Sequence, residues 1–359
     1  MKDEDYMRLA LQLAEGTRGQ TSPNPMVGSV VVKDGQIVGM GAHLKAGEGH
    51  AEVQALKMAG DKAYGATIYV TLEPCSHYGK TPPCADLIIE RGLKRVVIAM
   101  VDPNPAVAGK GVEKLRKAGI KVKIGVCEQE SRDLNQVFFH YIKTKKPFVT
   151  LKSATTLDGK TATVTGKSKW ITGPPSREDV HHYRHTHDAI LVGSGTVIAD
   201  NPSLTTRLPN GGKNPVRVIL DRQLRTPLDA NIVTDGEAPT WIMTTKAASQ
   251  EKEKLLQEKG VTIIRVDAFS ISSVLEELGR RSITSVFVEG GAEVNGGFLQ
   301  EKQVNQVITY IAPKLFGGAG APSVIGGEGV SEVDEALKFV IQNVVKIGDD
   351  VKIVSVREG

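Results

Sequence analysis

The sequence predicts two α/β domains joined end to end. Three observations support this class: the length of 359 residues exceeds one typical domain, short β-branched runs alternate with segments of helical periodicity, and a basic stretch at 143–147 interrupts the alternation. We expect the boundary in that stretch, giving domains at 1–145 and 146–359. Because no repeat relates the halves, two different folds are expected.

The first half reads α-β-β-α-β-α-β-α-β. Apolar residues at helical spacing predict a helix over 4–15 that ends at Gly16. Asp34-Gly35 should join strands at 27–32 and 36–43, because this dipeptide supplies the positive φ angles of a tight hairpin. The other expected elements are helices at 50–60, 84–92 and 112–119 and strands at 66–72, 95–102 and 120–126. The order is typical of a three-layer α/β domain.

The second half begins with a strand at 148–156 and continues to alternate. Helical periodicity covers segments such as 176–187 and 252–260. Apolar and β-branched runs predict further strands at 189–197, 215–221, 240–245, 261–267, 285–291 and 305–313.

Composition indicates a globular protein, with 40% hydrophobic and 24% charged residues. The first residues are acidic and show neither a signal-peptide nor a membrane-span pattern, so we expect a cytoplasmic protein. The formal net charge of +4 is scattered among 41 acidic residues. This distribution suits an anionic small molecule better than nucleic acid.

Two of the three cysteines, Cys75 and Cys84, lie in the run EPCSHYGKTPPC, and Cys127 stands apart. Three cysteines cannot form a disulfide framework, and a close pair in a reducing compartment more often binds metal or reacts. His50 and Glu52, in the run HAE, add an imidazole and a carboxylate. Because a catalytic zinc takes three protein ligands and keeps one position open, the pattern predicts one hydrolytic zinc site per chain.

The same residues have the roles that hydrolytic deamination requires. Two thiolates and a neutral imidazole would let the metal acidify a water, and Glu52 could pass its proton to a leaving amine. His-x-Glu and Pro-Cys match the zinc-deaminase signature, although eight residues, instead of two, separate Cys75 from Cys84. We expect His50 and Glu52 in the first turn of one helix and Cys84 at the start of the next, where the dipole stabilises a thiolate.

With these residues the sequence resembles the bifunctional riboflavin-biosynthesis deaminase/reductase family over nearly its whole length. The second half contributes KPFVTLKSATTLDGK, SKWITG, ILVGSGTVIADNPSLTTR and VEGG. The resemblance implies a cytidine-deaminase-like three-layer domain followed by a dihydrofolate-reductase-like domain. It implies zinc-dependent deamination of 2,5-diamino-6-ribosylamino-4(3H)-pyrimidinone 5′-phosphate, then NADPH-dependent reduction of its ribosyl chain to ribityl.

Site residues also follow from the resemblance. It implies that His50, Cys75 and Cys84 hold zinc and that Glu52 is the proton shuttle. The deaminase substrate would contact Asn24, His43, Lys80, Asp102 and Asn104. NADPH would contact Ala154, Trp170, Thr196, Asp200, Arg222 and the 291–297 segment, which is Gly291, Ala292, Glu293, Val294, Asn295, Gly296 and Gly297. The reductase substrate would contact Ser168, Arg184, Leu204, Arg207 and Glu289.

Several of these residues have an ordinary structural alternative. Asn24 and Asn104 stand between prolines, where asparagine often only completes a turn. Arg184 and Arg207 suit a phosphate, but a single arginine is more often a solvated surface charge. The glycines after 285–288 suit a phosphate, although neither they nor VGSGTV form the Rossmann fingerprint. The run HHYRHTH, at 181–187, is expected to be a partly exposed helix without metal.

Two other functions stay open. One is a deaminase of nucleic acid or free nucleosides whose second half only binds or regulates, but the 5% aromatic content argues against RNA. The other is a non-catalytic metal scaffold with a nucleotide-sensing domain, which would not need Glu52. The expected partners are pyrimidine ribose phosphates and further copies of the chain in a homo-oligomer, without nucleic acid or membrane.

Overall fold

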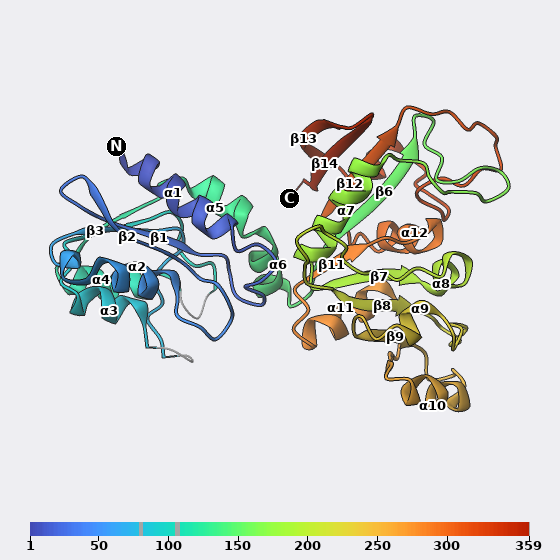
Figure 1. The fold of residues 1–359 in the computed structure, drawn as a ribbon, viewed down its shortest axis with the longest axis horizontal. Coiled ribbons are helices and arrows are strands. Elements are labelled where there is room, and N and C mark those ends of the chain that lie inside the picture. Colours follow the sequence, from blue (N-terminus) through green and yellow to red (C-terminus); the bar gives the residue numbers. More distant parts are fainter. Residues whose placement is uncertain (79–81, 105–107, 359) are drawn as a thin grey trace. The chain divides into compact units, whose positions relative to one another are not determined.

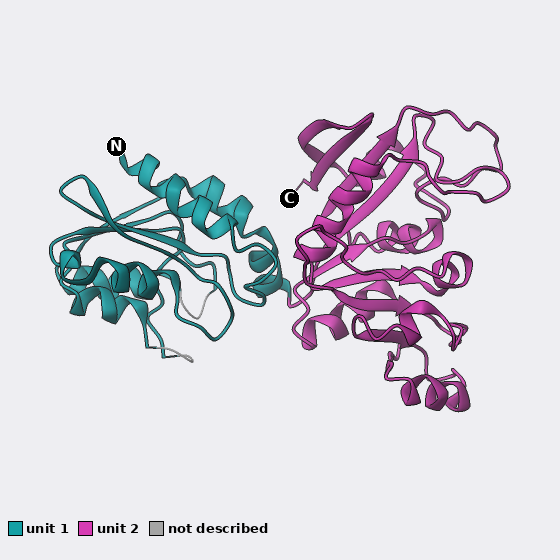
Figure 2. Ribbon diagram, in the orientation of Figure 1, with its two compact units in different colours: residues 1–144 teal, residues 145–359 magenta. Residues whose placement is uncertain are grey.

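The computed structural model describes residues 1–78, 82–104 and 108–358. The chain divides into two compact units, unit 1 at Met1–Thr144 and unit 2 at Lys145–Gly359 (Figure 2). None of the helices in the described ranges has the length and apolar character needed to cross a bilayer.

Unit 1 is a five-stranded sheet covered by helices on both faces (Figure 1). The strand order is β2-β1-β3-β4-β5, with β1 antiparallel to both neighbours and β3, β4 and β5 parallel. Helices α1 and α5 cover one face, and α2, α3 and α4 cover the other. The elements are α1 (Asp3–Glu15), β1 (Gly28–Lys33), β2 (Gln36–Ala42), α2 (Ala51–Ala59), η1 (Gly60–Ala63), β3 (Thr67–Val70), α3 (Cys84–Glu90), β4 (Arg95–Ile98), α4 (Lys110–Lys117), β5 (Lys121–Ile124), α5 (Glu128–Leu134) and α6 (Gln136–Thr144).

The β1–β2 hairpin confirms the turn predicted at Asp34-Gly35. Lys33 pairs with Gln36, so the two residues between them form the connection. Both have positive φ, 50° at Asp34 and 77° at Gly35, which glycine and aspartate tolerate better than branched residues. The hairpin places β1 in the interior of the sheet, where Val30, Val31 and Val32 are buried.

Unit 2 is a nine-stranded sheet in the order β10-β9-β8-β7-β11-β6-β12-β14-β13. The strands from β10 to β12 are parallel, and β14 and β13 extend the sheet as an antiparallel hairpin. Helices α11 and α12 pack on one face, and α7 to α10 pack on the other. The elements are β6 (Phe148–Thr156), α7 (Pro174–Thr186), β7 (Ala189–Gly193), α8 (Ser194–Asp200), β8 (Val216–Leu220), α9 (Asn231–Thr234), β9 (Thr240–Thr244), α10 (Gln250–Glu258), β10 (Thr262–Arg265), α11 (Ile271–Arg280), β11 (Ser285–Val288), α12 (Ala292–Gln300), β12 (Gln306–Ala312), η2 (Val333–Glu335), β13 (Phe339–Ile347) and β14 (Asp350–Arg357).

Beyond shifts of a few residues at the ends of elements, the structure departs from the sequence predictions in the following segments. The strand predicted over 189–197 ends at Gly193, which has extended backbone angles and caps α8, so 194–197 are helical. Helices α5 and α6 occupy 128–144, where no element was expected and where part of the predicted linker lies. The β13–β14 hairpin was also not assigned. The sequence signal that could have identified it was the alternating β-branched residues on either side of Gly348. In the structure Gly348 forms the turn with a φ of 60°.

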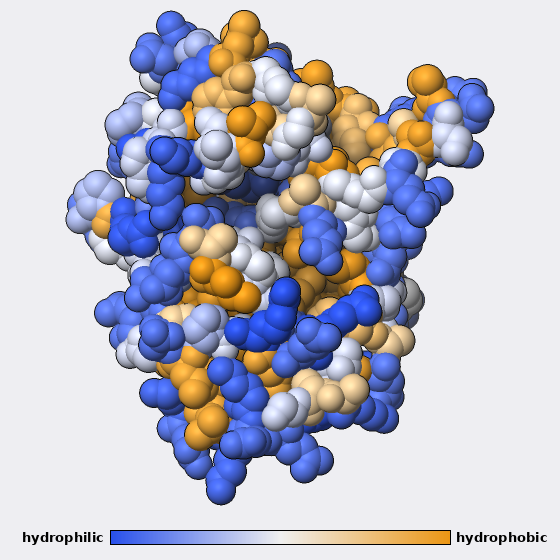
Figure 3. Space-filling view, turned by 90° about the vertical axis from the view of Figure 1, so that its right-hand side faces the viewer, coloured by the Kyte–Doolittle hydropathy of each residue, from blue (hydrophilic) through white to orange (hydrophobic). Residues whose placement is uncertain are grey.

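The carboxyl ends of the parallel strands of unit 2 form one edge of the sheet. In Figure 1 the carboxyl ends of β7 and β8 point to the right, toward α8. Seen from that side, the surface is hollowed and mixes hydrophilic with hydrophobic side chains (Figure 3). Ligands of open α/β sheets commonly bind at such an edge.

Candidate functional site: a metal centre in unit 1 and a charged cluster in unit 2

Three metal-binding side chains of unit 1 meet at the starts of two helices. His50 is the N-cap of α2, Cys84 is the first residue of α3, and Cys75 lies in the loop after β3. His50 Nδ1 lies 3.6 Å from Cys75 Sγ and 3.3 Å from Cys84 Sγ. Cys84 also donates its backbone N–H to Cys75 Sγ at 3.3 Å. The predicted positions of His50 and Glu52 in the first turn of α2, and of Cys84 at the start of α3, are confirmed.

The pKa values of the two thiols, Cys75 and Cys84, shift in opposite directions. The hydrogen bond from Cys84 lowers the pKa of Cys75 to about 4, with a further contribution from His50. The same contact, together with burial, raises the pKa of Cys84. A second thiolate beside the first is therefore unfavourable unless a cation lies between them. The arrangement is electrostatically suited to a metal ion.

The donor set fits zinc. One imidazole nitrogen and two sulfur atoms lie within 4.8 Å of one another, and they form the one such group of histidine, cysteine and acidic residues within the described ranges. Nitrogen and sulfur are the preferred zinc ligands, and three of them leave the fourth tetrahedral position free for water or substrate. Glu52 is 3% exposed in the first turn of α2, and burial raises its pKa to about 7. An acid–base group therefore lies beside the metal ligands.

Asn24 and His43 lie next to this cluster. The His43 ring is 5.4 Å from that of His50, edge to face, and is almost fully buried. Asn24 Nδ2 lies 3.0 Å from His43 Nε2, and His43 Nδ1 lies 3.4 Å from the Gly49 carbonyl. Since the carbonyl can only accept, His43 carries its proton on Nδ1 and accepts from Asn24. Burial lowers the pKa of His43, which favours this neutral form.

Asp102 and Asn104 follow β4 on the same side of the sheet. Asn104 donates its backbone N–H to Asp102 Oδ1 at 2.8 Å, and burial raises the pKa of Asp102. Because β3 and β4 are parallel neighbours, the loops that follow them, which carry Cys75 and Asp102, leave the same edge of the sheet. Lys80, the fifth expected substrate contact, lies outside the described residues.

Glu73 is a polar residue of this region that the sequence analysis did not single out. It lies two residues before Cys75, is 5% exposed, and accepts hydrogen bonds from the loop after β4 and from the first turn of α4. A carboxylate directly after an apolar strand was the sequence signal that could have identified Glu73, because a buried charge requires hydrogen-bond partners.

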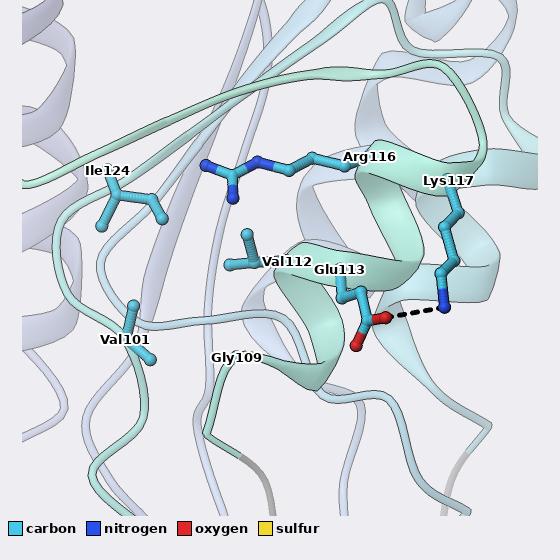
Figure 4. Close-up of a pocket in the computed structure, with 7 residues that line it drawn as sticks. All are labelled: Val101, Gly109, Val112, Glu113, Arg116, Lys117 and Ile124. Atoms are coloured by element: carbon cyan, nitrogen blue, oxygen red, sulfur yellow. Dashed lines mark ion pairs between the residues drawn. The ribbon is translucent and has the colours of Figure 1, made fainter.

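A separate hollow of about 490 Å³ lies beside α4 (Figure 4). None of the residues expected for the deaminase lines it, and the Arg116 side chain extends from α4 toward Ile124 (Figure 4). Its lining is Val101, Gly109, Val112, Glu113, Arg116, Lys117 and Ile124.

In unit 2, Arg184 and Glu289 form a partly buried ion pair at the end of β11. Arg184 Nε and Nη2 donate to the two carboxylate oxygens at 2.7 and 3.1 Å, and Nη1 donates to the Thr205 carbonyl at 3.0 Å. Lys152 Nζ lies 3.7 Å from Glu289 Oε2. Burial alone would raise the pKa of Glu289, but Arg184 and Lys152 lower it to about 2. Two residues expected to contact substrate therefore bind each other.

Lys152 was not among the expected site residues. It lies on β6, between buried neighbours, with a side chain 18% exposed, and burial lowers its pKa. A lysine in the middle of an otherwise buried strand was the signal that could have identified it, because such a charge is retained only with a partner.

Arg207 and His181 form the exposed border of this cluster. Arg207 Nη1 donates to Thr205 Oγ1 at 3.1 Å, and its backbone N–H donates to His181 Nδ1 at 3.2 Å. Burial lowers the pKa of His181 to about 4, and Arg184 and Arg207 add to the effect. Leu204 is buried nearby in the same segment, whereas Ser168 lies half-buried in the loop before α7. A hollow of about 450 Å³ opens here, lined by Arg177, Glu178, His181, Arg207, Leu208 and Pro209.

Three of the four histidines in the run 181–187 make hydrogen-bond contacts within unit 2, and His181 is one of them through the Arg207 amide. His185 Nδ1 accepts the backbone N–H of Lys213 at 2.8 Å. His187 contacts the Tyr183 carbonyl and Thr150 Oγ1, and it is buried. These contacts fix α7 against the sheet and so orient Arg184.

Most residues expected at the cofactor lie at or just beyond the carboxyl end of a parallel strand. Ala154 is near the end of β6, Thr196 and Asp200 are on α8 after β7, and Arg222 follows β8. Asp200 Oδ1 lies 3.9 Å from Lys169 Nζ, and Arg222 lies 5.0 Å above the Phe269 ring. Trp170, in the loop before α7, is 63% exposed beneath the Arg177 guanidinium.

The 291–297 segment is mostly helical. Gly291 is the N-cap of α12 and provides no side-chain cap, so the first amides of the helix remain available to a phosphate. Asn295 faces the protein, where Nδ2 donates to the Val324 carbonyl at 2.9 Å, and Gly296 packs against Gly326. Only the start of the segment therefore has the geometry of a phosphate-binding turn, which fits a dinucleotide cofactor.

Comparisons with known proteins identify both units. The family model described as the RibD C-terminal domain matches residues 147–353, and that of the cytidine and deoxycytidylate deaminase zinc-binding region matches residues 1–100. The riboflavin biosynthesis protein RibD of Bacillus amyloliquefaciens is 52% identical over 356 residues, covering 99% of this chain and 96% of that protein. The RibD of Escherichia coli is 42% identical over 364 residues, covering 98% of each.

Solved structures of similar proteins support the same family. RibD from Acinetobacter baumannii, form 1, is 41% identical with a TM-score of 0.90 over 99% of each chain. The Thermotoga maritima diaminohydroxyphosphoribosylaminopyrimidine deaminase/5-amino-6-(5-phosphoribosylamino)uracil reductase is 42% identical with a TM-score of 0.88 over 99% of each chain. The predicted cytidine-deaminase-like and dihydrofolate-reductase-like domains are thereby confirmed. The chain belongs to the RibD family of bifunctional riboflavin-pathway enzymes, which combine a zinc-dependent deaminase with an NADPH-dependent reductase.

Proposed function

We propose that this chain deaminates 2,5-diamino-6-ribosylamino-4(3H)-pyrimidinone 5′-phosphate and then reduces the ribosyl chain with NADPH, giving 5-amino-6-ribitylaminouracil 5′-phosphate. The two activities in the name of the Thermotoga maritima relative support this pair of reactions. The observation that carries the proposal is the group His50, Cys75 and Cys84 beside the buried Glu52. We assign residues 1–145 to the deaminase and 146–359 to the reductase.

In the deaminase, His50, Cys75 and Cys84 hold zinc. When bound, zinc supplies the Lewis acid that activates water for attack on an amidine carbon. Glu52 takes a proton from the water and delivers it to the departing amino group. Its burial supports this role, because a carboxyl removed from water binds and releases a proton near neutral pH more readily than an exposed one.

The pyrimidine and its ribose phosphate contact Asn24, His43, Asp102 and Asn104, together with Lys80. The contact between Asn24 and His43 supports a joint role, since His43 is held in one tautomer beside the metal ligands. Lys80 is assigned to the phosphate on the resemblance alone.

Substituting Glu52 by glutamine distinguishes the proposed deaminase from a non-catalytic metal-binding scaffold. Glu52→Gln should retain one zinc per chain and lower ammonia release by roughly 10²- to 10⁴-fold, the usual contribution of a general acid–base group. Glu90→Gln, an exposed glutamate on α3, is the matched control and should release ammonia normally. Normal ammonia release by Glu52→Gln would refute the assignment. Activity on cytidine or RNA exceeding that on the pyrimidinone would favour the nucleic-acid alternative.

In the reductase, NADPH supplies the hydride, and the protein holds the cofactor and the sugar phosphate face to face. The carboxyl-edge residues Ala154, Thr196 and Asp200, with Trp170, Arg222 and the start of the 291–297 segment, line the cofactor side. Ser168, Leu204 and Arg207 line the substrate side, and the Arg184–Glu289 pair forms its floor. Arg207 is the best-placed phosphate ligand, because Arg184 already donates to Glu289 and Thr205.

We also propose that the chain forms a homo-oligomer in the cytoplasm and acts on small molecules, independently of nucleic acid and membranes. The edge strand β13 supports self-association. Val340, Ile341 and Val344 are 56%, 60% and 57% exposed on it, and an apolar edge strand is a favourable surface for pairing. Val344→Lys should reduce the mass measured by analytical ultracentrifugation, whereas Val330→Lys, in a loop, should not. An unchanged mass in Val344→Lys would refute this surface.

A further inference from the structure

The Glu73 carboxylate connects the metal-ligand loop to the loop after β4. Each of its two oxygens accepts two backbone N–H groups. Oε1 accepts from Gly111 at 2.8 Å and Val112 at 3.1 Å, and Oε2 accepts from Gly109 at 2.9 Å and Asp102 at 3.2 Å. One buried side chain therefore satisfies the first amides of α4 and the amide of an expected substrate contact.

The backbone around Glu73 is fixed as well. Glu73 donates its N–H to the Met100 carbonyl at 3.0 Å, and the Cys75 carbonyl accepts the N–H of Ala85 at 3.1 Å. The three residues from Glu73 to Cys75 are thus connected to the end of β4 on one side and to the first turn of α3 on the other. A displacement of this segment would move Cys75 relative to both.

The contact between this segment and α4 has no spare room. A Cβ atom at Gly111 would lie 2.1 Å from the Pro74 carbonyl oxygen, so only glycine permits this approach. Gly109, before the helix, has a φ of 76°, which also favours glycine. The sequence at 109–111 is therefore adapted to bring α4 against Glu73.

We propose that Glu73 is a positioning residue that sets the substrate loop at 102–104 relative to the zinc ligand Cys75. The inference rests on the proposed function, which assigns Cys75 to zinc and Asp102 and Asn104 to the pyrimidine substrate. Glu73 holds the Asp102 amide, and Asp102 Oδ1 in turn accepts the Asn104 amide at 2.8 Å. A single carboxylate thereby orients both substrate contacts.

The two oxygens explain why glutamate, and not glutamine, is required. A carboxylate has acceptors at both positions, whereas an amide of the same shape offers one oxygen and one NH₂ group. In Glu73→Gln, two of the four amides, of which those of Gly111 and Val112 are buried, would face another donor and lose their partner. The substitution therefore tests hydrogen bonding with little change in volume.

The test uses the full-length, zinc-loaded protein. Glu73→Gln should raise the KM of deamination roughly 10- to 100-fold, the effect expected when substrate contacts are displaced, with zinc content and reductase kinetics unchanged. Hydrogen exchange of the amides at 108–115 should accelerate. Glu73→Asp, which keeps both acceptor oxygens, should recover part of the lost KM. Glu113→Gln is the control, because Glu113 pairs with Lys117 on the exposed side of the same helix (Figure 4) and should change neither quantity.

The outcomes separate this inference from the proposed function. If Asp102→Ala and Asn104→Ala leave KM unchanged, the substrate assignment fails and the inference fails with it. If those variants raise KM but Glu73→Gln does not, the inference alone is wrong. A Glu73→Gln protein that loses zinc and activity in parallel, with KM unaltered in the active fraction, would give Glu73 a purely structural role and overturn the proposal.

Discussion

The metal centre of unit 1 and the charged cluster of unit 2 are assembled in different ways. His50, Cys75 and Cys84 come from neighbouring stretches of the chain and meet at the starts of α2 and α3. Lys152 lies on β6 and Glu289 directly after β11, which is distant in sequence, and Arg184 joins them from α7. The first site is a local motif, and the second exists only when β6, β11 and α7 pack together.

The two sites also differ in charge. At the thiol pair His50 favours the thiolate of Cys75, and the contact between the two sulfur atoms drives the pKa values of Cys75 and Cys84 apart. In unit 2, Glu289 is compensated by Arg184 and Lys152, and Arg207 adds a further positive charge at the rim. The first site is therefore prepared for a metal ion and the second for an anion.

The largest effect is expected from removing the thiolates. The double variant Cys75→Ser, Cys84→Ser should lose the single zinc ion of the wild-type chain, because serine is a poor zinc ligand. Ammonia release should fall on the order of 10³-fold or more, the equivalent of several kcal/mol of metal-ion catalysis. Metal analysis and an ammonia assay measure the two quantities.

Cys127→Ser is the matched control, since this third cysteine lies at the start of α5 outside the metal cluster. It should keep full zinc and full activity. Wild-type protein without zinc, or a double variant that retains it, would contradict the metal centre.

An intermediate effect is expected at the rim of the unit 2 cluster. Arg207→Ala should lower kcat/KM of the reductase step by roughly 10- to 150-fold, which corresponds to the 1.5–3 kcal/mol of a charge-assisted hydrogen bond. Ammonia release should continue unchanged. Steady-state assays of both reactions on one preparation provide the measurement.

Arg280→Ala is the control, because Arg280 is a surface arginine with 71% of its side chain exposed. It should leave both reactions unchanged. Loss of deamination with normal sugar reduction in Arg207→Ala would show that the two activities are assigned to the wrong units.

The contrast between the sites explains what could be predicted from the sequence. The zinc ligands and Glu52 were identifiable because metal ligation requires particular side chains at restricted spacing. The positions of His50 and Cys84 on their helices followed from the same pattern. In unit 2 the residues were assigned by resemblance, and the pairing of Arg184 with Glu289 was not anticipated, because it depends on how α7 packs on the sheet.

Lys152 and Glu73 were missed for a related reason. Each is a charged residue within or beside an apolar strand, and its partners lie far away in sequence. Pattern analysis shows that such a residue needs a partner but does not show which one. The predicted strand over 189–197 was too long for a similar reason. Its partner strand β8 ends at Leu220, which pairs with Gly193, and the chain becomes helical at Ser194.

The smallest predicted effect concerns the stability of unit 1 and its pH dependence. Asp3, at the start of α1, accepts hydrogen bonds from Arg95 at 2.9 and 2.8 Å, Lys123 at 2.8 Å and Tyr69 at 3.0 Å. The Arg95 interaction, opposed by burial and aided by Lys123, holds the pKa of Asp3 well below its usual range. Because the pKa is lower in the folded state, the stabilisation is complete above the unfolded-state pKa, near 4, and is lost as the pH falls through the folded-state value.

Asp3→Asn should therefore lower the free energy of unfolding of unit 1 by about 1–2 kcal/mol at pH 7, since one bidentate pair and one lysine contact are lost at a partly exposed site. The difference from wild type should shrink as the pH falls below the usual carboxyl range. Hydrogen exchange in urea, followed by mass spectrometry, reports peptides from β3 and β4 separately from those of unit 2. Asp61→Asn, at an exposed carboxylate in η1, should have no such effect. A difference that grows on acidification, or that appears equally in unit 2, would show that Asp3 does not secure α1 to the sheet of unit 1.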